Sequence, residues 1–466
     1  MTIISISILS IINVNAKSTT FYEGEYIDGI YMNKYQYSNN TIYYQKARLF
    51  RNSENNDFAY CIEPFRFFTD GSIYEETINP SNLSNDQKDR IAKIAHFGYG
   101  YSNHTDIKWY AVTQMMIWQV AGGNTGDFYF SNTLNGPKTD NFRAEINEIN
   151  DLVDKYNIAP SFVNNTYNIV LGQTLNLKDN NNVLNYYKVS NNIEKNNDTV
   201  TFKGNTKGEY EFTLTREENS FNRPTIFYQS NNSQNIMQTG NLDNKTYKFK
   251  IKVHNPTITI VKIDKDTQSI ITSGEASLDG AIFKLYDSNK VEIQELEIKN
   301  NLVSIDKLNF GKYYIQEITP GTGYNLDNEL YEIELTDKKP DIELIIQNEV
   351  IKKKITIKKM YGETNKFQSE KNIDFEVYNN RNELLKTIST DELGQVEITL
   401  PYGTYKFVQI NSTEGYNKVE PFYITINDNE DELIELKDYK IPVPDTHKNK
   451  NINILNLLLY LLLNTL

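Results

Sequence analysis

The 466-residue chain is poor in the residues that build disulfides and metal centres: it has one cysteine and four histidines. A single cysteine excludes an intramolecular disulfide and a cluster of cysteine metal ligands. Four scattered histidines argue against a zinc site. We therefore expect no metal and no cofactor.

The chain also lacks an excess of positive charge. It carries 61 acidic and 48 basic residues, for a formal net charge of −13. Nucleic-acid binding needs a concentrated positive footprint, so a nucleic-acid partner is not expected. The length corresponds to about three domains of roughly 150 residues each. The hydrophobic share of 39% is enough for folding but leaves modest cores.

No apolar run reaches the roughly 20 residues that span a bilayer. Residues 1–16 are apolar and end in Val14-Asn15-Ala16, which predicts a cleaved signal peptide; a buried first strand is the alternative. Residues 452–466 are apolar but short, and resemble a minimal or truncated membrane tail. Together these ends predict an exported protein.

What is abundant is aromatic and β-prone sequence, with 33 Tyr and 22 Phe. Residues 20–80 alternate aromatic and polar side chains, which is typical of strands. Three helices are expected next: one after the capping-box pattern that begins at Ser84, one from Thr105 or Asp106 to Gly122-Gly123, and one over about 141–156. From residue 165 onward the pattern favours short strands alone.

The lone cysteine, Cys61, follows Ala59-Tyr60 and precedes Ile62-Glu63-Pro64, a pattern that predicts a short strand stopped by proline. One interpretation is a small buried hydrophobe, the usual place of an isolated cysteine. The other is a reactive group, because exported proteins normally pair their cysteines.

Gln114 is the anomaly of the second expected helix. It falls inside the apolar stripe, four residues from Tyr110 and four from Trp118. A buried amide needs a hydrogen-bond partner. Either Gln114 bonds the backbone of the β-layer, or its amide carbon reacts with a cysteine on a facing strand, expels ammonia and leaves an internal thioester.

Two motifs together resemble the thioester domain of Gram-positive surface proteins: Tyr60-Cys61-Ile62-Glu63-Pro64, and Thr113-Gln114-Met115-Met116-Ile117-Trp118. The resemblance covers residues 20–160. It implies an α+β domain in which Cys61 and Gln114 form the thioester. It also implies an adhesin that acylates an amine of a host surface or matrix protein.

Residues 256–350 and 351–440 repeat one pattern of strands and turns, and so predict two diverged copies of a domain. The pattern resembles the SpaA-like, Cna B-type β-sandwich of pilins and adhesin stalks. That resemblance implies an isopeptide bond between Lys262 and Asn348, promoted by Glu317. Without it, a Lys and a Glu on a solvated strand face would be the ordinary interpretation.

The second copy departs from this pattern. Lys359 is retained, but Gln409 stands at the glutamate position and Asp438 at the asparagine position. A carboxamide cannot donate and accept a proton as a carboxylic acid does. We therefore expect an ordinary sandwich here, although a Lys–Asp linkage with loss of water is chemically feasible.

The remaining segments connect and anchor these domains. Residues 161–255 form a β-rich segment that we interpret as a structural spacer, with a second ligand-binding sandwich as the alternative. Residues 441–466 contain Val443-Pro444-Asp445-Thr446, which resembles a variant sortase sorting signal. That resemblance implies cleavage after Thr446 and joining to the cell envelope, whereas a Pro-rich linker is the alternative.

The prediction is therefore a mostly β, multidomain surface protein: an α+β thioester domain followed by β-sandwiches, the last two of prealbumin-like, SpaA type. We expect a monomeric, wall-anchored adhesin with single-use rather than turnover chemistry. Two rivals stay open. One is a cysteine hydrolase or transglutaminase-like enzyme that uses Cys61 with His96 or His104, and the other is a purely structural pilin.

Overall fold

The computed structural model describes residues 17–190 and 193–442. It divides into two units, residues 1–253 and 254–466. The expected signal peptide, the sorting signal with Thr446 and the apolar tail lie outside the described residues. Within the described ranges, no helix combines the length and apolarity that crossing a membrane requires.

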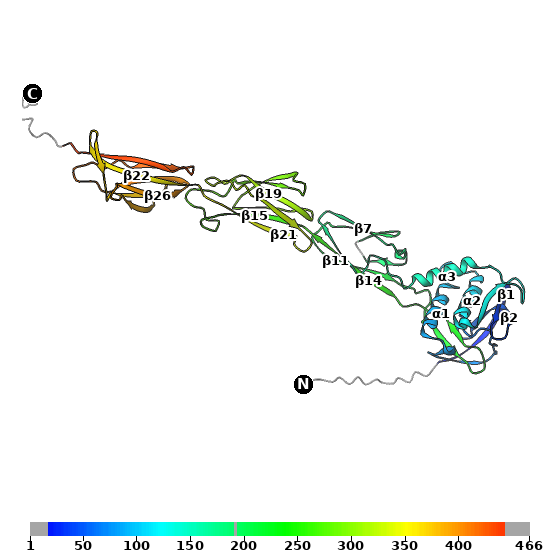
Figure 1. Ribbon diagram of the computed structural model, residues 1–466. Coiled ribbons are helices and arrows are strands. Elements are labelled where there is room, and N and C mark those ends of the chain that lie inside the picture. Colours follow the sequence, from blue (N-terminus) through cyan, green and yellow to red (C-terminus); the bar gives the residue numbers. More distant parts are fainter. Residues whose placement is uncertain (1–16, 191–192, 443–466) are drawn as a thin grey trace, which may run out of the picture. The chain divides into compact units, whose positions relative to one another are not determined.

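The first unit opens with a seven-stranded sheet in the order β2-β3-β13-β12-β4-β1-β5. Its long antiparallel strands β1 and β2 come from the aromatic, alternating segment and lie together in Figure 1. The strands of this sheet are β1 (Ser18–Gln36), β2 (Thr41–Asn52), β3 (Phe58–Cys61), β4 (Ile73–Glu76), β5 (Gly126–Ser131), β12 (Ile226–Gln229) and β13 (Ile236–Gln238).

Three α-helices accompany this sheet: α1 (Asn85–Phe97), α2 (Lys108–Gly122) and α3 (Arg143–Lys155). The capping box at Ser84 is confirmed, because its side chain accepts from the Gln87 backbone while the Gln87 side chain accepts from the Ser84 backbone. Helix α2 is buried without interruption from Trp109 to Trp118 and contacts β1, β2, β3 and β5. It is therefore the helix that covers Cys61. Short 3-10 turns occur at η1 (Pro80–Asn82) and η2 (Gly123–Thr125).

A smaller β-sandwich with its own core follows within the same unit. One layer is β7-β10-β9 and the other is β6-β14-β11-β8. The elements are β6 (Thr166–Val170), β7 (Thr174–Lys178), η3 (Leu184–Tyr186), β8 (Lys188–Val189), β9 (Glu194–Asn196), β10 (Thr199–Lys203), β11 (Gly208–Arg216) and β14 (Lys245–His254). The expectation of strands without an α-helix after residue 165 is met throughout the described residues.

The interpretation of residues 161–255 as a separate spacer needs correction. The chain leaves the sandwich after β11, adds β12 and β13 to the first sheet, and returns as β14. Strand β13 pairs with β3, with Ile236 opposite Cys61. Short strands of this kind have no local signal for the sheet they join, because their neighbours lie far away in sequence. This excursion completes the surroundings of Cys61.

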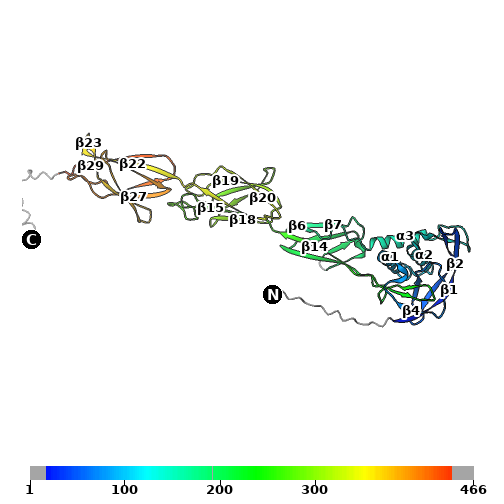
Figure 2. The ribbon, with the colours of Figure 1, turned by 60° about the horizontal axis from the view of Figure 1, so that its bottom comes forward.

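The second unit contains two sandwiches of the same topology. In the first, a β18-β15-β21 layer encloses a core with a β17-β16-β19-β20 layer, and Figure 2 shows strands of both layers. First strand β15 and last strand β21 are parallel neighbours. The strands are β15 (Thr257–Asp264), β16 (Ile282–Tyr286), β17 (Glu292–Glu297), β18 (Leu302–Ile305), β19 (Gly311–Thr319), β20 (Leu330–Leu335) and β21 (Asp341–Asn348).

The second sandwich repeats this plan and adds one hairpin. Its first strand β22 pairs in parallel with the last strand β29, with β26 on its other side, and continues into the short strand β23. The facing layer is β25-β24-β27-β28. The strands are β22 (Lys352–Glu363), β23 (Lys366–Ser369), β24 (Asp374–Tyr378), β25 (Leu384–Ser389), β26 (Gln395–Pro401), β27 (Gly403–Gln409), β28 (Phe422–Ile426) and β29 (Glu432–Tyr439).

Candidate functional site

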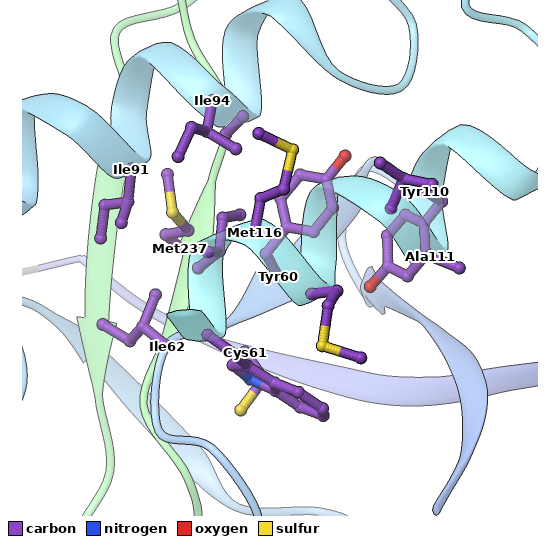
Figure 3. Close-up of a cluster of buried hydrophobic side chains, with 14 of the residues drawn as sticks. Tyr60, Cys61, Ile62, Ile91, Ile94, Tyr110, Ala111, Met116 and Met237 are labelled. Atoms are coloured by element: carbon purple, nitrogen blue, oxygen red, sulfur yellow. The ribbon is translucent and has the colours of Figure 1, made fainter. Parts of the chain in front are cut away.

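Cys61 ends strand β3, as its sequence neighbourhood predicts, and is fully buried. Figure 3 shows it beside Tyr60 and Ile62, in a cluster with α2 residues and with Met237 of β13. The ring of Tyr60 stacks on that of Tyr110 with centroids 4.8 Å apart. The Tyr110 hydroxyl donates to the Ala59 carbonyl at 2.6 Å and so ties α2 to β3 directly ahead of the cysteine.

Gln114 meets the backbone of Cys61, not its sulfur. The Cys61 N–H donates to Gln114 Oε1 at 2.9 Å, and Gln114 Nε2 donates to the Cys61 carbonyl at 2.7 Å. The Gln114 amide thus accepts one hydrogen bond from the Cys61 backbone and donates one to it, as the backbone of an adjacent strand would. These two bonds satisfy the buried carboxamide. The structure therefore corrects the expected pairing of Gln114 with the thiol and favours the backbone-bonded alternative.

A different glutamine meets the sulfur. Cys61 Sγ lies 2.6 Å from Gln234 Oε1, and Gln234 is almost completely buried. Gln234 directly precedes Asn235, whose carbonyl accepts from the Ile62 N–H at 3.0 Å, and β13 begins one residue later. Sequence reasoning missed Gln234 because it lies 173 residues from Cys61, just before a short strand, in a segment without helical periodicity. Its one signal is the polar pair Gln234-Asn235 directly before Ile236-Met237.

Burial raises the pKa of the Cys61 thiol to about 12, although the nearby Trp118 indole acts to lower it. The thiol is therefore neutral near pH 7, as expected for a sulfur sealed in an apolar layer. In the described part of the chain, Trp118 Nε1 is buried without a hydrogen-bond acceptor. An indole N–H beside the sulfur is a donor available to an oxygen that gains negative charge there.

Gln234 also borders a surface hollow of about 400 Å³. Exposed aromatic rings contribute to its walls, among them Tyr26 and Tyr43, and Phe67 is 90% exposed. Arg48 and Arg66 also line the hollow, and they are ion-paired with Glu23 and Glu63 respectively. The amide of Gln234 thus lies between the buried sulfur and an opening to solvent.

The two histidines of the hydrolase alternative have other partners. His96 Nδ1 hydrogen-bonds with the Gly240 carbonyl at 2.9 Å, and its Nε2 faces Glu218 at 3.6 Å. His104 stacks on Trp109 with centroids 3.6 Å apart, and its Nδ1 lies 2.7 Å from the Phe97 carbonyl oxygen. Among the described residues, neither imidazole is hydrogen-bonded to Cys61.

In the first sandwich of the second unit, the structure brings Lys262, Glu317 and Asn348 together. Lys262 Nζ contacts Asn348 Oδ1 and lies 2.9 Å from Glu317 Oε1. Asn348 Nδ2 donates to Glu317 Oε2 at 2.8 Å. All three side chains are buried. Burial lowers the pKa of the Lys262 ammonium, opposed by the charge of Glu317.

In the second sandwich Lys359, Gln409 and Asp438 also converge. Lys359 Nζ contacts Asp438 Oδ1, and Gln409 Nε2 donates to Asp438 Oδ2 at 2.7 Å. A fourth residue, which sequence reasoning did not single out, completes the cluster: Glu370 Oε2 lies 3.0 Å from Lys359 Nζ. Glu370 comes from the added hairpin, so alignment of the two repeats offers no counterpart for it.

Two family models match separate parts of the chain, in agreement with the domains described above. A thioester-domain family model matches residues 58–157, and the SpaA prealbumin-like fold domain matches residues 256–350 and 353–440. No curated protein sequence matches the chain.

Solved structures are similar at low identity. The Bacillus anthracis TIE protein is 19% identical, with a TM-score of 0.35, and the match covers 91% of this chain and 84% of that one. The thioester domain of the Staphylococcus aureus TIE protein is 19% identical, with a TM-score of 0.38, over 51% of this chain and 99% of that one. GBS52, the minor pilin of Streptococcus agalactiae, is 15% identical, with a TM-score of 0.22, over 42% and 100%.

The two family models assign the parts of the chain on either side of the small sandwich, and the observed strands and helices agree with both. The chain contains a thioester domain followed by two SpaA domains of the prealbumin-like fold.

Proposed function

We propose that this protein is a surface adhesin that couples covalently to an amine of a host protein through an internal thioester between Cys61 and Gln234. The observation that carries the proposal is the 2.6 Å contact between Cys61 Sγ and Gln234 Oε1. Gln114 then positions the cysteine through its backbone, as its two hydrogen bonds indicate.

Thioester formation needs no reagent from outside the domain. The sulfur attacks Gln234 Cδ, the S–C bond forms, the C–N bond breaks, and ammonia leaves with the proton of the thiol. Trp118 Nε1, buried without an acceptor among the described residues, can donate to the oxygen that becomes negative during attack. Burial of the sulfur afterwards slows hydrolysis, because water must reach the carbonyl carbon through the hollow.

Transfer to the host consumes the thioester once. A neutral amine attacks Gln234 Cδ, an amide forms between Gln234 and the host side chain, and Cys61 leaves as a free thiol. The hollow beside Gln234 provides the approach, and its aromatic walls are suited to the stem and ammonium of a lysine before deprotonation. Because no step restores the thioester, this is single-turnover chemistry and not enzymatic catalysis.

The first SpaA domain acts as a reinforced stalk element in this proposal. Lys262 Nζ attacks Asn348 Cγ, ammonia leaves, and Glu317 carries the proton between the two nitrogens. Lys262 lies on the first strand and Asn348 on the last, which are parallel neighbours. A bond between them passes pulling force from one strand to the other and bypasses the rest of the domain.

Attachment to the producing cell completes the proposal. Export, cleavage by a sortase after Thr446 and joining of the monomer to the cell envelope follow from the sequence resemblance. A wall-fraction blot of wild type and Thr446→Ala tests this part. The variant should move from the wall to the medium.

The test of the adhesin is the intact mass of the full chain before and after methylamine, followed by peptide mapping. We expect one ammonia missing for the thioester, restored as bound methylamine at Gln234 together with a titratable thiol. Cys61→Ala and Gln234→Ala should both abolish the labelling. Labelling at Gln114 would reject our assignment of the partner.

A chain with no thioester mass deficit and a thiol that titrates from the start would reject the adhesin mechanism. Replacement of His96 and His104 would then test the hydrolase alternative. A structural pilin role would be favoured if both histidine variants behaved as wild type.

A further inference from the structure

Strand β2 has a free edge beside the reactive sulfur. It pairs with β1 along most of its length, but with β3 only at Phe50 and Arg51. Strand β3 ends at Cys61, and Pro64, which has no N–H to offer a neighbouring strand, follows three residues later. In the described part of the chain, residues 41–48 therefore have β1 as their only strand partner.

Gln114 separates β3 from β2 at this point. The Ile62 N–H donates to the Asn235 carbonyl on the β13 side, so the backbone groups of Cys61 point to the opposite side, toward β2. There the Gln114 amide takes both of them. The edge of β2 is left open from the position of Cys61 onward.

The backbone groups on this edge are available for pairing. Every second residue of an antiparallel strand directs its N–H and C=O away from its partner strand. Within the described ranges, the backbone of residues 42–48 forms no hydrogen bond outside the β1–β2 ladder. An unpaired edge of this kind is a template for an added strand.

The hollow beside Gln234 runs along this edge. Four successive residues of β2, 43–46, line it, and so do four successive residues of the facing loop, 65–68. Successive strand residues point to opposite faces of a sheet. A hollow lined by all of them therefore lies along the edge of β2 and not over one face. Gln234 borders the same hollow, so an added strand would lie next to the reactive amide.

The charged side chains around the hollow are already neutralised. Each basic residue that lines it has a carboxylate partner, in the pairs Arg48–Glu23, Lys46–Asp28 and Arg66–Glu63. The aromatic rings on its walls supply apolar area instead. The hollow is thus suited to the main chain and apolar side chains of an occupant, without a requirement for a charged motif.

We propose that the acyl acceptor is a lysine in an extended segment of the host protein, which adds to the free edge of β2 as a further strand. The inference rests on the proposed function, because Gln234 is the acyl donor. Main-chain hydrogen bonds to residues 42–48 hold the segment, and its alternate side chains pack on the aromatic walls. A lysine in a helix or on a rigid globular surface lacks the free main chain that this edge requires.

Docking changes the rate of the acyl transfer and not its chemistry. The neutral Nζ of the docked lysine attacks Gln234 Cδ, the C–N bond forms and the C–S bond breaks. One proton of the nitrogen passes to the sulfur, which leaves as the Cys61 thiol. The added strand holds the amine next to the carbonyl carbon and so raises its effective concentration.

The test is the rate at which a short lysine peptide couples to the full-length protein, followed by intact mass. The peptide has one lysine between alternating threonine and valine, and N-acetyl-lysine amide supplies the same amine without a strand. We expect the peptide to couple at least about tenfold faster at equal concentration. N-methyl groups on alternate peptide residues should abolish this advantage in one of the two possible patterns and preserve it in the other, because only one edge of the peptide faces β2.

Equal rates for the peptide and for N-acetyl-lysine amide, with methylamine labelling of Gln234 intact, would overturn the docked strand and leave the thioester in place. A chain that methylamine does not label would instead reject the thioester. The two failures are therefore distinguishable.

A pair of tyrosine variants locates the docking. Tyr44→Ala removes a ring that lines the hollow and should lower the ratio of peptide coupling to methylamine coupling. Tyr37→Ala is the matched control: Tyr37 is 50% exposed and Tyr44 is 47% exposed, but the Tyr37 hydroxyl donates to Asp127 away from the hollow. Its ratio should equal that of wild type. An unchanged ratio in Tyr44→Ala would reject the hollow as the place of docking.

A second measurement does not depend on the thioester. Cys61→Ala cannot be acylated, so any effect of the peptide on this variant is non-covalent. Hydrogen exchange followed by mass spectrometry should show slower exchange of the β2 amides in millimolar peptide, with the amides of β14 as the internal control. Exchange in β2 that the peptide leaves unchanged would overturn the proposal.

Discussion

The amide of Gln114 forms two hydrogen bonds with the backbone of a single residue, Cys61, one to its N–H and one to its carbonyl. A helix side chain thus takes the place of a neighbouring strand and determines where the sulfur lies. The sulfur itself contacts Gln234. The two glutamines therefore have separable roles, which mutation can distinguish.

Replacement of Gln114 should destabilise the domain, whereas replacement of Gln234 should mainly remove the reaction. Gln114→Leu leaves two buried backbone groups of Cys61 without partners, so we expect a loss of about 1–3 kcal/mol in unfolding free energy. Urea unfolding of both variants in a Cys61→Ala background makes the comparison free of the thioester. Equal stabilities would contradict the positioning role of Gln114.

A free Cys61 thiol should make the free energy of unfolding depend on pH in the alkaline range. In Gln234→Ala the cysteine stays unacylated, and burial raises its pKa from 9.0 to about 12. The folded state then holds a proton that the unfolded state loses, so stability should fall as pH rises above about 9.

The measurement is the free energy of unfolding as a function of pH for Gln234→Ala. Subtracting the same measurement for Gln234→Ala/Cys61→Ala removes the contribution of the buried tyrosines. Iodoacetamide should accordingly modify Cys61 slowly at pH 8 in folded Gln234→Ala. Rapid modification would show that the sulfur is not sealed.

The thioester should form only in a chain that includes β13 and Gln234. A chain ending at residue 160 lacks β13, the strand that pairs with β3, and also lacks Gln234. We expect that this truncation exposes its core and forms no thioester. A chain ending at residue 254 retains both features and should show the full mass deficit. Methylamine labelling of the shorter chain would contradict our assignment of β13 to the site.

The contact between the first two helices should tolerate no added methyl group. A Cβ at Gly98 would lie 2.1 Å from Thr113 Oγ1, next to Gln114 on α2. Gly98→Ala should therefore cost about 1–3 kcal/mol and lower the yield of thioester. Gly208→Ala is the control, because its nearest heavy atom would be 3.7 Å away. Thermal denaturation and intact mass, measured on both variants, check the difference.

Loss of the first isopeptide bond should appear as a loss of stability. Lys262 and Asn348 are 86 residues apart, and closing a loop of that size in the unfolded chain is worth roughly 4–5 kcal/mol on the entropic model used for disulfides. Glu317→Gln should retain one ammonia and unfold at lower temperature. If Glu317→Gln still lacked the ammonia of the Lys262–Asn348 bond, Glu317 would not be required for the reaction.

Much of this protein was predictable because its signals are local. The capping box at Ser84 begins α1, the apolar stripe produces α2, and the strand before Pro64 ends at Cys61. The repeated pattern of the last two domains marks Lys262 and Asn348 by their correspondence to Lys359 and Asp438. The sandwich brings the side chains of Lys262 and Asn348 into contact. Patterns of this kind act over a few residues or repeat along the chain, so the linear sequence contains them.

The partners of the reactive groups depend on tertiary structure. Gln234 reaches Cys61 because a hairpin from the following sandwich joins the first sheet, and Glu370 reaches Lys359 because a longer strand folds back on itself. Sequence reasoning singled out Gln114 and Gln409, whereas the structure also brings Gln234 to the Cys61 sulfur and Glu370 to Lys359. Strand pairing between distant segments is decided by the packing of the whole domain, and a buried polar side chain acquires its role from the atoms that this packing brings to it.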